Sequence, residues 1–194
     1  MSPGAIPAWT ADGVLPPINL SQPVSPDRSP YVVSLTDYVL RFGTTAERRA
    51  VLDGYLRYRA ALHSVGLVQG FQWLDGSFLE HVEVTERRAP NDIDVVTFFH
   101  LPTATSQAQL AAQESELFDN ESVLATYRVD AYLVHLGMPP ERLTQQSAYW
   151  YSVWSHRRNQ RWKGFVQVDL TPTEDLAAAA TLANPPPSST GVRP

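Results

Sequence analysis

The sequence predicts a mixed α/β (α+β) protein, in which helices pack on one β-sheet of modest size. Apolar residues make up 43% of the 194 residues and charged residues 18%, a composition that favours a buried core over disorder. The apolar periodicity also changes from segment to segment, in the order helix, strand, strand, helix, strand, helix, strand. A chain of this length suits a single domain.

The two ends of the chain differ in composition from the middle. Residues 1–30 contain prolines from Pro3 to Pro30, which fix φ and remove backbone donors, so we expect an extended proline-rich arm. Apolar residues such as Ile6 and Trp9 indicate that this arm lies across the domain. The domain itself is predicted to span residues 31–172. Residues 173–194, which end in NPPPSSTGVRP, are predicted to form a flexible C-terminal tail.

Helical signals come first in the domain. A short helix is expected at about Leu35 to Phe42. Thr44 and Glu47 are spaced as a capping box for a longer helix, which runs through Val65 and ends at Gly66.

The remaining elements alternate between strands and helices. The turn signal Pro90-Asn91 places Asp92 at the mouth of the second strand. The predicted strands are Gly70–Asp75, Ile93–Phe99, Tyr127–Leu136 and Trp162–Leu170, and the predicted helices between them are Ser106–Phe118 and Glu141–His156.

Asp92 and Asp94 are the first candidates for chemistry. Residues two apart on a strand point to the same face, so both carboxylates project together. Two adjacent anionic groups repel unless a cation lies between them, and carboxylate oxygens are ligands that Mg²⁺ prefers. The spacing also arises by chance on exposed strands, so by itself it is a weak indication of a site.

Gly76 and Ser77 end the preceding strand and are the second candidate element. Glycine lets the backbone approach a phosphate closely, and successive amides with a serine hydroxyl can hold its oxygens. An ordinary tight turn is the alternative for this pair taken alone.

These motifs together resemble the DNA polymerase beta superfamily of nucleotidyltransferases. The match consists of WLDGS at residues 73–77, fourteen intervening residues, and DIDVV at residues 92–96. More narrowly, the segments GVLPPI, WLDGSF and PNDIDVV resemble an uncharacterised group of small bacterial nucleotidyltransferase-like proteins, over roughly residues 5–170. The resemblance implies a polymerase beta-like nucleotidyltransferase fold.

The superfamily pattern also implies a third carboxylate on a neighbouring strand, and Asp130 fits it. A lone aspartate in an apolar strand needs a partner, so a salt bridge with Arg128 is the alternative, and Asp169 is a rival for the catalytic role. By resemblance, Asp92, Asp94 and Asp130 would be catalytic and would hold two Mg²⁺ ions. A nucleoside triphosphate would then transfer its α-phosphoryl group in line to a hydroxyl, with pyrophosphate leaving.

The resemblance assigns the triphosphate to Gly76 and Ser77, with basic side chains neutralising it. Lys163 and Arg158, within the segment HRRNQRWKG, are the candidates. Cations also favour the C-terminal end of a helix, so Arg158 and its neighbour Arg157 have a second explanation that involves no ligand.

Aromatic residues cluster near the same segment. They can stack a nucleobase, but the spacing of Trp150 and Trp154 fits core packing as well. The cluster comprises Tyr149, Trp150, Tyr151, Trp154 and Trp162.

Composition limits the partners. The net charge of −5 argues against wrapping long nucleic acid, and the absence of cysteine excludes disulfides and thiolate catalysis. Without a signal-like start or a membrane-length apolar window, a cytoplasmic protein with no membrane partner is expected. The expected substrate is a nucleoside triphosphate. The acceptor would be a protein, such as a cognate toxin, an RNA end or a small molecule.

Two other functions compete with nucleotide transfer. A nucleotidyltransferase fold can serve as a non-catalytic binding module or antitoxin that acts through a protein partner, although three converging carboxylates argue against a mere scaffold. A nuclease also uses paired carboxylates with magnesium, but it does not need the phosphate-binding turn at Gly76-Ser77.

Overall fold

A mixed five-stranded sheet forms the centre of the protein. The computed structural model describes residues 4–103 and 105–184. The strands lie in the order β1-β5-β2-β3-β4, with β1–β5 and β3–β4 parallel and β2 antiparallel to both of its neighbours. Their bounds are Tyr31–Val32 (β1), Gly70–Asp75 (β2), Ile93–Phe99 (β3), Val129–His135 (β4) and Val166–Asp169 (β5). The prediction of an α+β mixed sheet with helices packed on it is confirmed.

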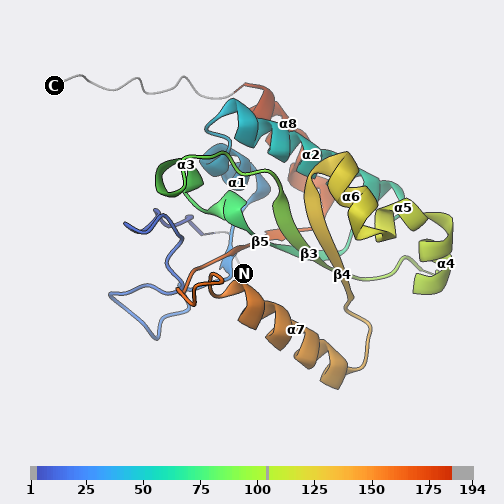
Figure 1. Cartoon of the computed structure of the whole chain (residues 1–194). Coiled ribbons are helices and arrows are strands. Elements are labelled where there is room, and N and C mark those ends of the chain that lie inside the picture. Colours follow the sequence, from blue (N-terminus) through green and yellow to red (C-terminus); the bar gives the residue numbers. More distant parts are fainter. Residues whose placement is uncertain (1–3, 104, 185–194) are drawn as a thin grey trace.

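Most of the helices cover one face of this sheet, and a single helix lies on the other (Figure 1). The apolar faces of the first group meet the inward side chains of the strands to form the core. This group comprises α1 (Leu35–Phe42), α2 (Ala46–Ser64), α6 (Asn120–Tyr127) and α8 (Asp175–Ala183), and the opposite helix is α7 (Pro140–Trp154). In the described part of the chain, no helix is long and apolar enough to cross a membrane.

The long helix α2 is buried along most of one side. Its N-cap is Thr45, whose side chain accepts a hydrogen bond from the Arg48 amide, so the predicted start at Thr44 is one residue early. Tyr55, in the middle of the helix, donates a hydrogen bond of 2.7 Å to the buried Gln72 of β2. The Gln72 side chain is fully paired within the core, because its amide nitrogen also donates to the Thr97 hydroxyl at 2.9 Å.

The segment between β3 and β4 contains three short helices rather than one. The predicted helix Ser106–Phe118 is divided into α4 (Gln107–Gln113) and α5 (Ser115–Phe118), and α6 follows. The division falls at Glu114, whose backbone leaves the helical conformation (φ −123°, ψ 48°). The Asp119 side chain then accepts from the Ser122 amide and starts α6. Arg128 then adopts a left-handed conformation and ends α6, so β4 begins two residues later than predicted.

The predicted flexible tail is wrong for its first part, because a 3-10 helix at Pro172–Glu174 and α8 follow β5. The fully buried Arg59 guanidinium explains why this segment folds onto the domain, since a buried cation needs a partner. Asp175 accepts hydrogen bonds from it at 2.9 and 2.8 Å. Residues 185–194 of the predicted tail lie outside the described residues.

The N-terminal arm lies across the domain, as its apolar residues predicted. Trp9 is held between two side chains: the Arg41 guanidinium is 4.0 Å from its ring centroid, and the His81 ring stacks on it at 4.3 Å. Further along, the carbonyl of the buried Leu15 accepts a hydrogen bond of 2.8 Å from the Gly164 amide. The arm thus connects the segment after β2 with the segment before β5.

Candidate functional site

Three aspartates form one row at the ends of the neighbouring strands β2, β3 and β4. Asp75, the last residue of β2, is paired in register with Asp94 of β3, and Asp94 is paired with Asp130 of β4. Directly opposite residues on adjacent strands point to the same face with Cβ atoms about 5 Å apart. The sheet therefore brings together Asp94 and Asp130, which the sequence predicted as partners, and adds Asp75.

This row opens into a pocket of about 810 Å³. Asp92, at the entrance to β3, lines the same pocket, so all three predicted acidic residues share one cavity. The other predicted site residues, Gly76, Ser77, Arg158 and Lys163, line it too. Side chains of α7 and of the segment before β5 form the opposite wall.

Three of the acidic residues at this pocket, Asp92, Asp94 and Asp130, have no ion-pair partner in the described chain. Burial raises the pKa of Asp94 to about 7, and the neighbouring carboxylates of Asp75, Asp130 and Asp92 add to the shift. Burial and Asp130 likewise raise the pKa of Asp92. Among the described residues, no lysine, arginine or histidine forms an ion pair with Asp92, Asp94 or Asp130. Such a set of carboxylates attracts a cation.

The Asp130 carboxylate is oriented by its neighbours. It accepts a hydrogen bond of 2.7 Å from the Asn120 side-chain amide and one of 3.4 Å from the Tyr132 hydroxyl. The alternative salt bridge to Arg128 does not form in the described chain; Arg128 instead contributes its carbonyl, which accepts from the Ile93 amide at 3.1 Å. The Asp130 carboxylate is therefore held between Asn120 of α6 and Tyr132 of β4.

The oxygen donors of the site are of the kind that binds magnesium, although their side chains are not gathered around one position. In residues 4–103 and 105–184, no three acidic or histidine side chains are gathered as a metal cage. The carboxylates of Asp92, Asp94 and Asp130 share this pocket and are not paired with a basic side chain in the described chain. They are the hard oxygen donors that Mg²⁺ prefers.

Gly76 is required by the geometry of the turn after β2. Its φ of +83° is in the region that favours glycine, and an added Cβ would lie 2.7 Å from Oδ2 of Asp94. Ser77 then begins a 3-10 helix, Ser77–Leu79, and its side chain is partly exposed where it lines the pocket. The turn thus places backbone and hydroxyl groups beside Asp94, as a phosphate-binding role requires.

A buried arginine holds this turn against α2. The Arg48 guanidinium is fully buried and donates hydrogen bonds of 2.6 Å to the carbonyls of Phe78 and Glu80. It also pairs with the Glu83 carboxylate at 2.5 and 2.9 Å. Because the donors of Arg48 are used in fixing the loop, the position of Gly76 and Ser77 is coupled to the core.

Lys163 lines the pocket but is already paired. Its ammonium lies 2.8 Å from the Asp75 carboxylate and 3.3 Å from that of Glu80, which also pairs with Arg157. Burial disfavours the charged ammonium, yet the carboxylates of Asp75 and Glu80 together outweigh it and raise the pKa of Lys163. Burial also raises the pKa of Asp75 to about 6, against the opposing effect of Lys163. Lys163 is therefore shared between the pocket and this buried network.

Sequence reasoning missed Asp75 and Glu80. The signal for Asp75 was its position immediately before Gly76 at the end of a strand, where an acidic residue needs a partner. Of the two basic candidates, Arg158 is exposed, lines the pocket and forms no ion pair within the described ranges. Arg158 is therefore the cation that is available to a ligand.

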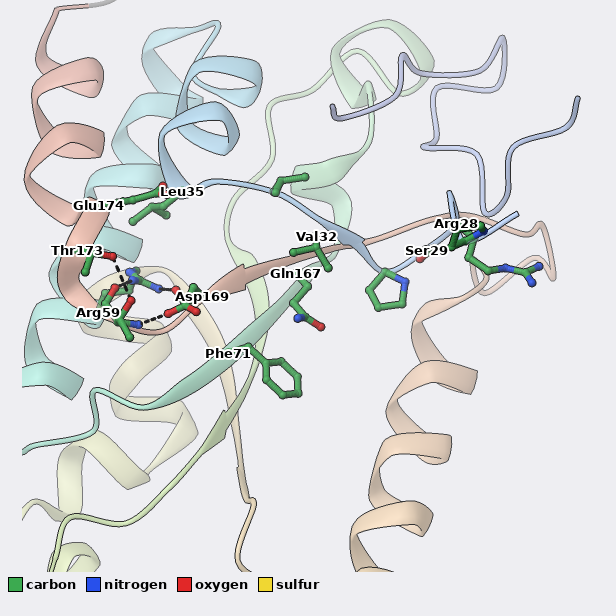
Figure 2. A pocket seen from close by; sticks show the side chains of 14 residues that line it. Arg28, Ser29, Val32, Leu35, Arg59, Phe71, Gln167, Asp169, Thr173 and Glu174 are labelled. Atoms are coloured by element: carbon green, nitrogen blue, oxygen red, sulfur yellow. Dashed lines mark hydrogen bonds between the residues drawn. The ribbon is translucent and has the colours of Figure 1, made fainter. Parts of the chain in front are cut away.

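Asp169, the rival third carboxylate, lies in a different hollow. This second pocket, of about 820 Å³, is at the β1 edge of the sheet and is lined by Asp169 together with Val32, Phe71 and Gln167 (Figure 2). Asp169 pairs in register with Phe71, four residues from Asp75 along β2, and its carboxylate accepts from the Thr171 amide at 2.7 Å. The fold thus selects Asp130 over Asp169 as the neighbour of Asp94.

The fold and the pocket define an α+β protein with a carboxylate-rich site at the ends of its central strands. The chain belongs to a family of unknown function, DUF6932, whose model matches residues 7–169. The match includes most of the arm, the aspartate row and the whole of β5. No curated protein and no solved structure matches the chain.

Proposed function

We propose that this protein is a metal-dependent nucleotidyltransferase with a polymerase beta-like fold. It would transfer a nucleoside monophosphate from a nucleoside triphosphate to a hydroxyl group of a protein, an RNA end or a small molecule. One observation carries the proposal: Asp92, Asp94 and Asp130 line a single pocket beside the Gly76-Ser77 turn, with no cation paired to them in the described chain. This shared pocket supports the nucleotide-transfer chemistry that the Gly-Ser and Asp-x-Asp motifs predict.

The carboxylates and the turn have separate tasks in this reaction. Asp92, Asp94 and Asp130 would hold two Mg²⁺ ions, which supply charge neutralisation of the triphosphate and lower the pKa of the attacking hydroxyl. The Gly76-Ser77 turn binds phosphate oxygens through its backbone amides and the serine hydroxyl.

Other side chains neutralise the pyrophosphate and accept the proton of the attacking hydroxyl. Arg158 neutralises the charge that develops on the pyrophosphate leaving group. The hydroxyl oxygen forms a bond to the α-phosphorus as the bond to pyrophosphate breaks, and Asp130 accepts the hydroxyl proton. Lys163 would reach a phosphate only by weakening its pairs with Asp75 and Glu80, so we assign it chiefly to holding Asp75 in place.

The decisive experiment is incubation of the purified protein with each labelled nucleoside triphosphate, Mg²⁺ and a set of acceptors that includes the products of adjacent genes. The wild-type protein should label an acceptor, and a variant carrying both Asp92→Ala and Asp94→Ala should not. Asp169→Asn is the matched control, because its carboxylate lies outside the pocket, and it should retain full transfer. A double variant that still labels the acceptor would exclude this assignment.

A non-catalytic binding module is the second candidate function. It is favoured by the hydrogen bonds that turn Asp130 toward Asn120 and Tyr132. In that function the wild-type protein transfers no nucleotide with any triphosphate but co-purifies with a protein partner, such as a cognate toxin. Asp130→Asn separates the two candidates, because it abolishes transfer by an enzyme and leaves the capture of a partner unchanged.

A further inference from the structure

The aromatic cluster of α7 divides into buried and exposed members. Trp154 is 5% exposed and packs against Phe165 with ring centroids 5.9 Å apart, so core packing explains it. Trp150 is half-buried, and Tyr149 is 57% exposed. Packing within the chain therefore does not explain why an aromatic ring stands at position 149.

Tyr149 ends a continuous line of rings that starts at the acidic row. The Tyr132 hydroxyl donates to the Asp130 carboxylate, and the Tyr132 ring lies 4.5 Å from that of Trp150. Trp150 in turn meets Tyr149 edge to face at 5.1 Å. All three aromatic side chains line the pocket that contains the aspartates. One wall of this pocket is thus aromatic from the carboxylates to the surface.

This wall offers a ligand the face of an aromatic ring rather than the indole N–H of Trp150. The indole Nε1 of Trp150 is buried and has no hydrogen-bond partner among the described residues. This atom therefore lies inside the wall, and the exposed ring of Tyr149 is the part of the wall that a ligand can contact. A flat aromatic ligand that stacks on the Tyr149 ring fits this wall.

We propose that Tyr149, supported from behind by Trp150, is the platform on which the base of the nucleotide stacks. The inference rests on the proposed function, because it places the base in the pocket whose carboxylates and Gly76-Ser77 turn receive the triphosphate. A stacked base is recognised by its π-face, so the platform accepts every nucleobase and gives affinity rather than base selection. The ring of Tyr149 matters for this role, and its hydroxyl does not.

Isothermal titration calorimetry with the full chain and Mg²⁺ tests this proposal. The ligands are ATP and inorganic tripolyphosphate, which has the phosphate chain without a base. The wild-type protein should bind ATP more tightly than tripolyphosphate. Tyr149→Ala should weaken ATP binding roughly 5- to 100-fold and leave tripolyphosphate binding unchanged, since loss of one stacking partner affects only the base. Tyr149→Phe should bind both ligands like the wild type.

Tyr151→Ala is the matched control. Tyr151 is on the same helix and is 39% exposed, but it does not line the pocket. Its loss should leave the Kd for ATP unchanged, and circular dichroism of each variant verifies that α7 is retained.

The outcomes separate this proposal from the proposed function. ATP binding that is equal in the wild type and Tyr149→Ala overturns the platform and leaves the phosphate site standing. The same conclusion follows if tripolyphosphate binds the wild type as tightly as ATP. ATP binding that requires Tyr149, in a protein that transfers no nucleotide, supports the platform and overturns the enzymatic function. Binding of neither ligand overturns both.

Discussion

Replacement of Asp94 by asparagine should stabilise the metal-free protein at alkaline pH. The pKa of Asp94 is raised from 3.8 to about 7, first by burial and then by its acidic neighbours. At about 1.4 kcal/mol per pH unit, the ionised carboxylate destabilises the fold by at most about 4 kcal/mol. Water reaches the partly exposed side chain and reduces this value, so we expect a gain of about 1–3 kcal/mol, or roughly 3–9 °C in Tm.

The sign of the effect fixes its pH dependence. The folded protein binds the Asp94 proton more tightly than the unfolded chain, so wild-type stability falls as pH rises from about 4 to about 7. Asparagine carries no charge, and the gain from Asp94→Asn should be largest near pH 8 and should disappear near pH 4.

Urea unfolding in EDTA, at about pH 8 and at about pH 5, measures the stability gain of Asp94→Asn and its dependence on pH. Asp169→Asn is the control, because that carboxylate is exposed and belongs to the other pocket. It should change the free energy of unfolding by less than about 0.5 kcal/mol. An Asp94→Asn variant that is less stable than the wild type at about pH 8 would refute the conclusion that Asp94 carries an unpaired, partly buried charge. A gain in stability that does not depend on pH would refute it too.

Two further predictions concern residues that fix the site and the core. Gly76→Ala should destabilise the fold by about 1–3 kcal/mol through its positive φ alone. It should also weaken Mg²⁺-dependent ATP binding, because the new Cβ displaces the Asp94 carboxylate. Unchanged ATP binding in calorimetry contradicts the role of the turn. Asp175→Ala should cost about 3 kcal/mol in urea unfolding, because it removes the partner of the buried Arg59. A loss below about 0.5 kcal/mol would show that the remaining partners of Arg59, among them Gln72, are sufficient.

The central strands and their acidic residues were predictable from the sequence. The strands Gly70–Asp75 and Ile93–Phe99 have the predicted bounds, because apolar runs and flanking turn residues are local signals. The same signals located Asp92 and Asp94, since their spacing on a strand fixes the direction of both side chains. The helix Leu35–Phe42 was equally local, with an N-cap serine and an amphipathic pattern.

Long-range pairing decided the rest. The register of three strands places Asp75 beside Asp94, and no local pattern encodes which residues of separate strands face each other. The charge of Lys163 is shared with Asp75 and Glu80 because β5 inserts between β1 and β2, which the order of elements along the chain does not reveal. The apparent tail folds as α8 for the same reason, because the buried Arg59 that it pairs with is more than a hundred residues away.

The sequence by itself thus determined which residues can carry charge and which strand each belongs to. Only the tertiary structure decided which charges are neutralised and which remain open to a ligand. The physical reason is that the propensities of strands and turns act over a few residues. The pairing of a buried charge, in contrast, depends on every segment that the fold brings within a few ångströms of it.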